Sequence, residues 1–487
     1  MPHPTIHIYG AGLAGSEAAL QLAAHGIPVK LFDLKPAQRS AAHHSNDFAE
    51  IVCSNSLGNL GLTTASGLLK QELQTLDCAL LKIAKACAVP AGNALAVDRE
   101  AFSAAVTHQL TTHPLIECIP EQATALPEDS TQLCIVATGP LTTPALANDL
   151  ARVTGGTQLF FFDAAAPIVT RESINMDVAF IQDRYGLERF EQSALAAGQS
   201  PERCALITGA YINCPLDKPQ YLALRQFLLD AEKTPLKDFE SQDVLPCAKS
   251  GEAQDGALKT NYFESCLPIE ELARRGEDTM RYGPLKPVGL INPHTGQQAY
   301  AVIQLRQDNA AGTLYNLVGF QTNLKWGAQK TLMQLIPGLE AAEVIRYGVM
   351  HRNTYLHSPS VLRPTLQLNA RPNVLVAGQL TGTEGYTESI ATGLWAAHNA
   401  LKLLHGQAPQ TLPTETMLGA LLAYITRPEA IGKNFQPINS NWGILPELEP
   451  PRPRGKAEKL QRYGARATQA LETFINQANV KETPMPV

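Results

Sequence analysis

The chain has 487 residues, of which 45% are hydrophobic and 17% are charged, and its formal net charge is −6 with an isoelectric point near 6.1. This composition excludes disordered, collagen-like and coiled-coil proteins, and the length corresponds to about two or three domains. The negative charge provides no general attraction to phosphate or anionic lipid, so a nucleic-acid partner would require a local basic patch.

Cysteine usage indicates the compartment. The nine cysteines are an odd number, no CxxC pair occurs, and the first ten residues do not form a signal peptide. We therefore expect a cytoplasmic protein with reduced thiols. No apolar run approaches the roughly 20 residues that span a bilayer, so we expect no membrane insertion. We also expect no metal site and no obligate protein partner.

The first predicted elements form a nucleotide-binding unit. A strand at residues 5–9 runs into a GxGxxG turn and an Ala/Leu-rich helix that stops at Gly26, and a second strand at residues 28–32 ends in Asp33. This order is the dinucleotide fingerprint, in which the glycines allow a tight turn, close approach of the pyrophosphate and close helix–strand packing. Asp33 is placed to bind ribose hydroxyls. The predicted cofactor residues of the turn are Gly10, Ala11, Gly12, Leu13, Ala14 and Gly15.

A helical pattern follows. Apolar residues recur at intervals of four and three between Leu69 and Ile83, which predicts one amphipathic helix that ends before Val89. We expect this stripe to serve only the core.

Two later segments indicate that the dinucleotide is FAD. A strand at residues 133–136 leads to Thr138 and Gly139, a pattern common in flavoproteins that bind two dinucleotides. A strand at residues 374–377 leads to Gly378 and Gln379 and then to a small-residue helix, as in the late flavin motif, where the turn meets the ribityl chain. No second GxGxxG follows a strand, which argues against a disulfide reductase.

These segments predict an α/β protein. Residues 1–150 and 365–450 would form a Rossmann-like FAD-binding domain of the GR2 type, interrupted by an inserted mixed α/β substrate domain at residues 151–364. Residues 451–487 would form a tail helix. Its basic stripe is either a solvated face or a phosphate contact, and consists of Lys456, Lys459, Arg462 and Arg466.

Ten longer motifs stand in the order known from one family. The chain resembles the folate- and FAD-dependent tRNA (uracil-5-)-methyltransferases, the TrmFO family, over most of its length up to about residue 450. The resemblance implies formation of 5-methyluridine in the T-loop of tRNA, with 5,10-methylenetetrahydrofolate as carbon donor and NADH or NADPH as reductant, and an inserted domain that binds tRNA and folate. The motifs are residues 10–19, 48–57, 89–99, 162–168, 262–270, 282–289, 304–308, 312–322, 347–354 and 433–437.

The chemistry requires a nucleophile and an acid–base group. Carbon 5 of uracil is a poor nucleophile until a group adds at carbon 6, and a thiolate is suited to that addition. A second group must remove the C5 proton, and reduced flavin must convert methylene to methyl. The resemblance implies that Cys53 and Cys266 are catalytic. We assign Cys266 as the nucleophile and Cys53 as its partner in proton transfer or covalent handling, although the sequence also allows the reverse assignment and the alternative that both are structural thiols. We expect the other seven cysteines to be structural.

Cationic residues within the motifs suit folate and tRNA. For folate we select Arg306, His351 and Arg352; the alternative is that the arginines form internal salt bridges and that the histidine lies in the core. For tRNA phosphates the candidates are Arg274, Arg275, Arg281, Lys286, Lys325 and Lys330, plus the tail stripe.

The chain departs from the family pattern in two respects. Many members have arginine where this chain has Gly58, so a phosphate or substrate contact is absent there or supplied elsewhere. The chain is also longer at residues 185–211 and 240–262 than many members are.

Two other functions compete with methylation of the T-loop. A GidA/MnmG-like flavoprotein would modify the wobble uridine of tRNA, but those chains are longer and carry an extended helical C-terminal region. The other alternative is a non-catalytic FAD- or RNA-binding protein with inert cysteines.

Overall fold

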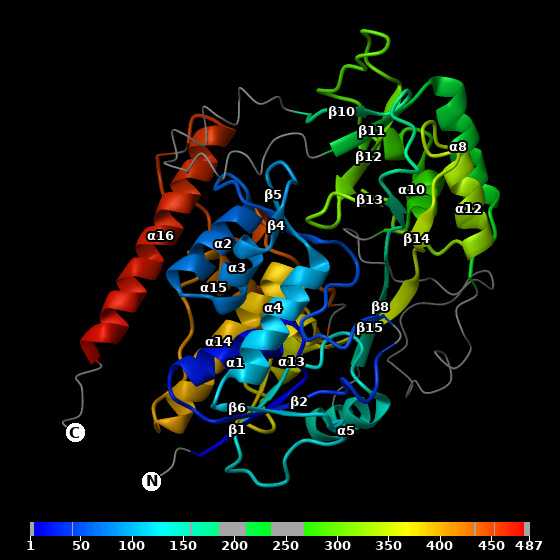
Figure 1. Ribbon diagram of the computed structural model, residues 1–487. Coiled ribbons are helices and arrows are strands. Elements are labelled where there is room, and N and C mark those ends of the chain that lie inside the picture. Colours follow the sequence, from blue (N-terminus) through cyan, green and yellow to red (C-terminus); the bar gives the residue numbers. More distant parts are fainter. Residues whose placement is uncertain are drawn as a thin grey trace.

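The computed structural model describes residues 4–40, 42–155, 158–184, 211–234, 267–432, 435–451 and 453–481; for residues 158–164, 351–352 and 478–481 it describes the backbone only. A parallel five-stranded sheet forms the base of the molecule (Figure 1). The strands, in spatial order, are β16 (Val374–Val376), β7 (Cys134–Val136), β1 (Ile6–Tyr9), β2 (Val29–Phe32) and β6 (Ile116–Ile119). They come from both sides of the expected insertion, and the predicted α/β fold class is confirmed. The exact domain boundaries stay a prediction.

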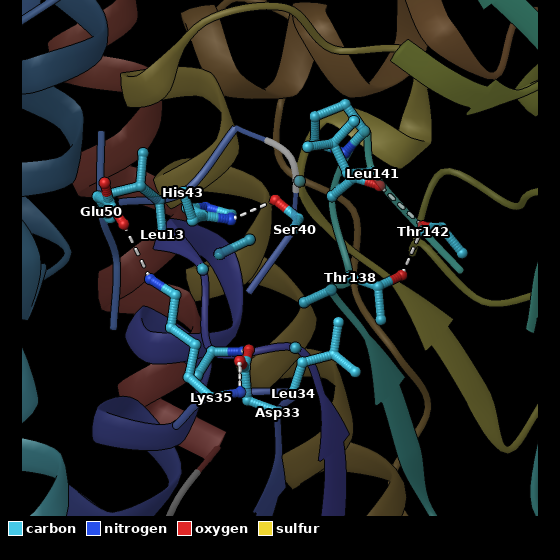
Figure 2. A pocket seen from close by; sticks show the side chains of 18 of the residues that line it. Leu13, Asp33, Leu34, Lys35, Ser40, His43, Glu50, Thr138, Leu141 and Thr142 are labelled. Carbon is cyan, nitrogen blue, oxygen red and sulfur yellow. Dashed lines mark hydrogen bonds and ion pairs between the residues drawn. The ribbon is translucent and has the colours of Figure 1, made fainter. Parts of the chain in front are cut away.

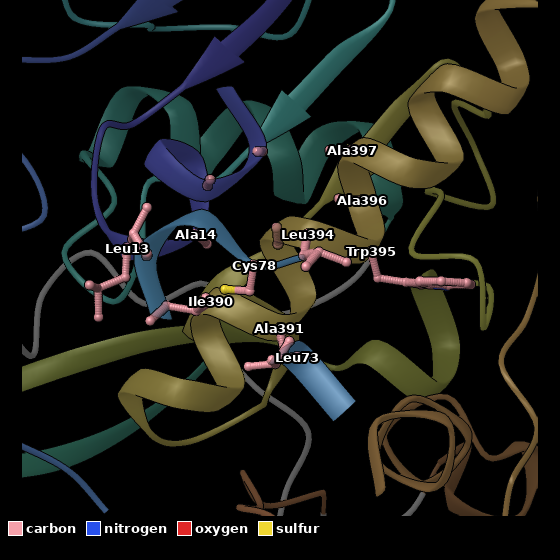
Figure 3. Packing of buried hydrophobic residues seen from close by; sticks show 14 of the residues in the cluster. Leu13, Ala14, Leu73, Cys78, Ile390, Ala391, Leu394, Trp395, Ala396 and Ala397 are labelled. Carbon is pink, nitrogen blue, oxygen red and sulfur yellow. The ribbon is translucent and has the colours of Figure 1, made fainter. Parts of the chain in front are cut away.

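Two helices of this part pack at very short range. They are α1 (Leu13–Ala24) and α14 (Tyr386–Leu404), in which a Cβ at Gly393 would lie 2.2 Å from the Ala14 carbonyl oxygen. Figure 3 shows Leu13, Ala14, Ile390 and Leu394 in the shared core. Two further helices of this part are α4 (Arg99–Thr112) and α5 (Pro144–Thr154).

The single helix expected around residues 69–83 is wrong, since the chain forms α2 (Ala65–Thr75) and α3 (Ala79–Ala86). Asp77 adopts a left-handed φ of 61°, which ends the first helix. The buried carboxylate of Glu17 then accepts hydrogen bonds from the amides of Ala79 and Leu80 and so caps the second helix. The leucine spacing continues across the break because both helices face the same core.

A small antiparallel sheet carries the segment after Cys53. Its strands are β3 (Ser56–Asn59), β5 (Ala94–Val97) and β4 (Ala88–Val89). The asparagine that precedes it, Asn55, is fully buried. This sheet therefore fixes the backbone next to the cysteine.

A second large sheet has its own hydrophobic core. Its strands, in order, are β10 (Phe180–Ile181), β11 (Tyr211–Leu216), β12 (Ala301–Gln307), β13 (Leu314–Leu317), β9 (Ile168–Thr170) and β14 (Val344–Arg346). The helices of this part are α8 (Lys218–Asp230), α10 (Ile269–Arg275), α11 (Thr279–Tyr282) and α12 (Trp326–Gln334). An antiparallel ribbon of β8 (Gln158–Ala164) and β15 (Met350–Leu356) runs between the two large sheets (Figure 1).

The C-terminal part returns to the first sheet. The long helix α16 (Lys456–Lys481) buries Tyr463, Ala467 and Leu471 in the main core. Arg462 and Arg466 donate hydrogen bonds to carbonyl oxygens of residues 446–451 and so tie the helix to the preceding segment. The remaining elements are α13 (Ser358–Val361), η2 (Gly378–Thr381), α15 (Met417–Ile425), η3 (Pro428–Ala430) and η4 (Trp442–Ile444). Within the described ranges, none of the helices is both long and apolar enough to cross a membrane.

Candidate active site

The first cavity lies where the strands of the parallel sheet end. Ten of the eleven predicted cofactor residues line it: Gly10, Ala11, Gly12, Leu13, Ala14, Asp33, Thr138, Gly139, Gly378 and Gln379. The eleventh, Gly15, acts through packing, because a Cβ there would lie 1.8 Å from the Gly10 carbonyl oxygen. Figure 2 shows Leu13 and Asp33 on one side of the cavity and Thr138 and Thr142 on the other.

The glycine-rich turn fits an anionic group. A Cβ at Gly12 would meet no atom within 4 Å, so the backbone is open to the cavity there. Gly12 is the N-cap of helix α1, which has no side-chain cap and no acidic residue in its first turn. The free amides and the helix dipole therefore favour a phosphate at this end, as a dinucleotide requires.

Asp33 stands beside the turn. Its carboxylate oxygens accept hydrogen bonds from the amides of Ala11 at 2.7 Å and Lys35 at 2.9 Å. These bonds hold the carboxylate at the cavity wall, where ribose hydroxyls of a dinucleotide would lie.

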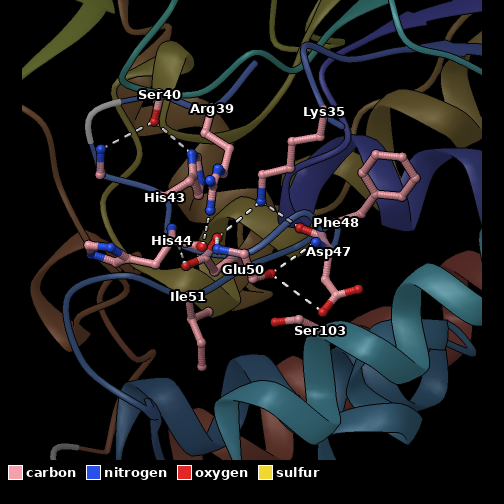
Figure 4. A network of polar contacts seen from close by, with 12 residues as sticks. Lys35, Arg39, Ser40, His43, His44, Asp47, Phe48, Glu50, Ile51 and Ser103 are labelled. Atoms are coloured by element: carbon pink, nitrogen blue, oxygen red, sulfur yellow. Dashed lines mark hydrogen bonds and ion pairs between the residues drawn. The ribbon is translucent and has the colours of Figure 1, made fainter. Parts of the chain in front are cut away.

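A buried ion pair closes the same end of the cavity. The Nζ of Lys35 lies 3.1 Å from Glu50, and Figure 4 shows the two side chains facing each other. Amides of His44 and Ser45 also donate to Glu50, and with Lys35 they lower the pKa of its carboxyl despite the opposing effect of burial. This network fixes the segment that leads to Cys53.

The second cavity continues from the first. Both are lined by Ala42, Val52, Pro140, Leu141, Gln379, Tyr386 and Ser389. Beyond these residues the second cavity is lined by Cys53, Ser54, Ser56 and the carboxylates of Glu384 and Glu388. A thiol and acid–base groups thus share a cavity that opens into the predicted flavin pocket.

Tyr386 fixes the backbone of Cys53. Its hydroxyl oxygen accepts hydrogen bonds from the amides of Cys53 at 2.8 Å and Ser54 at 3.2 Å. Desolvation and the neighbouring Cys53 raise the pKa of the Tyr386 hydroxyl, so it stays protonated. It therefore retains its own proton for donation while it holds the cysteine.

Arg306 secures the same segment from the other large sheet. Its guanidinium donates to Ser54 Oγ at 2.6 Å and to Asn55 Oδ1 at 3.0 Å. The side chain is buried, and burial lowers its pKa. The structure therefore gives Arg306 a positioning role toward Cys53, and its expected contact with folate stays a prediction.

A buried ion pair supports this arrangement. Arg99 of α4 contacts both carboxylate oxygens of Asp308 at 3.0 Å and donates to the Ile51 carbonyl oxygen. Asn316 joins Asp308 to Asn55 through one amide group. The cysteine segment is thus held between α4 and the second large sheet.

Sequence reasoning missed the polar groups around the second cavity. Glu388 accepts hydrogen bonds from the amide and hydroxyl of Ser440, while Glu384 pairs with Gln379. Lys70 is buried and donates to Ser66, which lines the cavity. Among these groups, only Glu388 could have been selected from the sequence, because it lies next to the late flavin motif.

Several predicted residues lie outside the described part. Cys266 is among residues 235–266, and the side chains of His351 and Arg352 are not described, although their backbone pairs with residues 163 and 162. Their roles stay predictions. The two longer segments also lie outside the described residues, apart from residue 211.

The other described cysteines differ from Cys53 in setting. Burial raises the pKa of the thiols of Cys78, Cys87, Cys118, Cys134 and Cys214. They do not line either cavity. A thiol whose pKa is raised stays protonated and is a poor nucleophile, which supports the structural role predicted for these five.

The candidate tRNA cations are partly engaged with acids. Arg274 pairs with Glu271 at 3.1 Å and Lys325 with Glu232 at 2.8 Å. Arg281 lies over the Tyr300 ring, 4.3 Å from its centroid. Exposed pairs of this kind are weak, so phosphates can displace them, and the expected tRNA contacts stay predictions.

Comparison with known proteins identifies the family. A model described as "Glucose inhibited division protein A" matches residues 5–408. The protein named "Methylenetetrahydrofolate--tRNA-(uracil-5-)-methyltransferase TrmFO" of Lysinibacillus sphaericus is 48% identical over 99% of this chain and 100% of its own length. The protein of the same name from Bacillus subtilis is 47% identical over 97% and 99%.

Solved structures agree at the level of the fold. Aquifex aeolicus GidA superposes with TM-scores of 0.64 and 0.62 in two crystal forms, at 16% and 15% identity, over 97% of this chain and 76% and 73% of that protein. The family recognised from the sequence motifs is confirmed. The chain belongs to the glucose inhibited division protein A family and, at the level of its nearly full-length relatives, to the TrmFO tRNA (uracil-5-)-methyltransferases.

Proposed function

We propose that the protein methylates carbon 5 of a uridine in the T-loop of tRNA, with 5,10-methylenetetrahydrofolate as carbon donor, FAD as cofactor and NADH or NADPH as reductant. The observation that carries this proposal is the position of Cys53, at the wall of a cavity continuous with the predicted dinucleotide pocket. The name and nearly full-length similarity of the TrmFO relatives support the same activity.

The residues present fit FAD. The open turn at Gly12 and the uncapped start of α1 would bind the pyrophosphate, and Asp33 would bind ribose. The turn at Gly378 and Gln379 would meet the other half of the dinucleotide. Bound FAD supplies the hydride that converts a one-carbon unit to methyl.

The chain's own groups perform the remaining tasks. Cys53 and Cys266 supply thiols, one for addition at carbon 6 of the uracil and the other for proton transfer or covalent handling. Tyr386 and Arg306 fix the Cys53 segment. His351 and Arg352 would bind the folate.

We place the protein in the cytoplasm. The six cysteines in the described part are not joined in disulfides, as a reducing compartment predicts. A cytoplasmic location would also bring the protein together with tRNA, reduced folate and nicotinamide nucleotides.

The purified protein tests the proposal directly. It is incubated with unmodified tRNA, NADPH and methylenetetrahydrofolate that carries a labelled methylene carbon, and the RNA is digested and mapped by mass spectrometry. We expect one label per tRNA, as 5-methyluridine in the T-loop. NADH in a parallel reaction determines which reductant is preferred.

Other outcomes would contradict the proposal. Label at the wobble position would assign the protein to wobble-uridine modification, which its GidA-like fold permits. Absence of label while NADPH still reduces the flavin would leave a flavoprotein that acts on another acceptor.

A further inference from the structure

Lys70 is a buried amine that the reaction as described does not use. It lies on α2, and its Nζ contacts the carbonyl oxygens of Asn59 at 3.1 Å and Ser66 at 3.3 Å, and Ser66 Oγ at 2.6 Å. A protonated amine has three N–H groups and no acceptor. All three are therefore used, and Ser66 Oγ must accept from Lys70.

This geometry leaves the hydroxyl hydrogen of Ser66 pointing away from Lys70. Because Oγ accepts from the ammonium group, the hydroxyl hydrogen is available to another acceptor. Ser66 lines the same cavity as Cys53. A charged donor on its oxygen also polarises the hydroxyl and strengthens the bond that it donates.

Gly58 leaves this hydroxyl uncovered. The residue has a left-handed φ of 87°, and a Cβ there would lie 2.6 Å from Ser66 Oγ and 3.4 Å from Lys70 Nζ. Any larger side chain would therefore meet the hydroxyl. Glycine at this position exposes Ser66 to the cavity.

The charge on Lys70 is set by its neighbours. Burial lowers the pKa of its amine to about 8, while the carboxylate of Glu388 on α14 opposes this effect. The adjoining β3 contributes the Asn59 carbonyl oxygen, which favours the protonated form. The amine is mostly protonated at neutral pH.

We propose that Ser66, held and polarised by Lys70, donates a hydrogen bond to the uracil carbonyl oxygen that gains negative charge when a thiolate adds to the ring. This inference rests on the proposed function and names a further contact for it. Ser66 would touch the substrate, and Lys70 is a positioning residue.

The test compares Ser66→Ala and Ser66→Thr with the wild-type flavoprotein in the labelled-methylene assay. Loss of one such donor lowers kcat by about 100-fold, and we expect Ser66→Ala to show at least about a tenfold loss. We expect the KM for methylenetetrahydrofolate, the FAD content and the rate of flavin reduction by NADPH to be unchanged. Ser66→Thr restores the hydroxyl and should recover most of the activity.

The pH profile separates this role from a structural one. As the pH rises through about 8, Lys70 loses its proton and the hydroxyl can donate to the free amine instead of the substrate. Wild-type kcat should therefore fall on the alkaline side, and this decrease should be absent in Ser66→Ala. Lys70→Met should reproduce the Ser66→Ala loss at pH 7, whereas Lys82→Met, at an exposed lysine of α3, should not.

A binding measurement keeps the inference independent of turnover. Barbituric acid, a pyrimidine whose oxygens carry negative charge at neutral pH, is titrated while the flavin spectrum is followed. We expect Ser66→Ala to bind it about tenfold more weakly. Unchanged kcat in Ser66→Ala, or a loss confined to the KM for folate, would overturn the inference. If the wild type forms no 5-methyluridine, the proposed function fails. The barbiturate titration then still tests the inference: affinities of wild type and Ser66→Ala that agree within a factor of about two would overturn it.

Discussion

At the scale of single residues, the polar contacts around Cys53 are specific enough to predict the effect of substitution. Arg306 is distinctive because it reaches two neighbours of Cys53 with one planar group, at 2.6 Å to Ser54 and 3.0 Å to Asn55. Lysine carries the same charge but cannot reproduce this fork. The side chain is buried, so water cannot replace the lost bonds.

We expect Arg306→Lys to lower the rate of 5-methyluridine formation by about tenfold, because a misplaced reactive group loses its alignment with the substrate. FAD content should stay at the wild-type level. Arg152→Lys, at an exposed arginine of α5, is the matched control and should be active. A tenfold rise in the KM for folate with unchanged kcat would instead favour a direct folate contact for Arg306.

Glu72 gives a residue-scale prediction about stability. It is buried and accepts hydrogen bonds from the amides of Met417 and Leu418, at the start of α15. Burial raises the pKa of its carboxyl to about 7, against an ordinary value of 4.5. Between these pH values the folded protein binds a proton that the unfolded chain has released, so the free energy of unfolding falls as pH rises.

Urea unfolding of wild type and Glu72→Gln at several pH values measures this contribution. The unfolding free energy of the wild type, relative to that of Glu72→Gln, should decrease by up to about 3 kcal/mol from pH 4.5 to 7. Glu472→Gln, at an exposed glutamate of α16, should track the wild type. A pH-independent difference would show that Glu72 titrates normally.

At the scale of elements, the close contact between the turn and α1 builds the cofactor pocket. A Cβ at Gly15 would lie 1.8 Å from the Gly10 carbonyl oxygen, and both atoms belong to rigid backbone. The helix would have to move away from the sheet, which would displace the amides that face the pyrophosphate.

We expect purified Gly15→Ala to retain no more than about a tenth of the wild-type FAD, as measured by absorbance after gel filtration. Gly464→Ala in α16 is the matched control, because a Cβ there meets no atom within 4 Å. That variant should bind FAD normally and be more stable by about 0.5–1 kcal/mol. A fully yellow Gly15→Ala protein would contradict the packing argument.

The elements also differ in how well sequence patterns predict them. The strand–turn–helix unit could be predicted because its contacts lie within about 30 residues, and Asp33 does bond to the turn at Ala11. The break between α2 and α3 could not, because Glu17 that caps α3 is 62 residues away in sequence from Ala79. Leucine periodicity indicates which side of the chain is buried, and it continues across the break because both helices face one core.

At the scale of the whole molecule, the site is made by contacts between the second large sheet and the segments packed around the parallel sheet. Arg306 and Asp308 belong to the second sheet and its following turn, whereas Asn55 and Arg99 belong to the first part. Arg306 and Ser54 are separated by 252 residues in sequence. No local pattern encodes such a contact, so the motif residues could be predicted from sequence, but the positioning role of Arg306 and the Ser66–Lys70 pair could not.

The central claim is that methyl transfer takes place in the cavity beside Cys53. The most direct test is a single-turnover reaction of Cys53→Ala, with Cys118→Ala as control, in which NADPH-driven flavin reduction and labelled 5-methyluridine are measured in the same sample. We predict that Cys53→Ala reduces its flavin at the wild-type rate but forms at least about 100-fold less product, while Cys118→Ala does both normally. Product formation by Cys53→Ala at the wild-type rate would contradict the account.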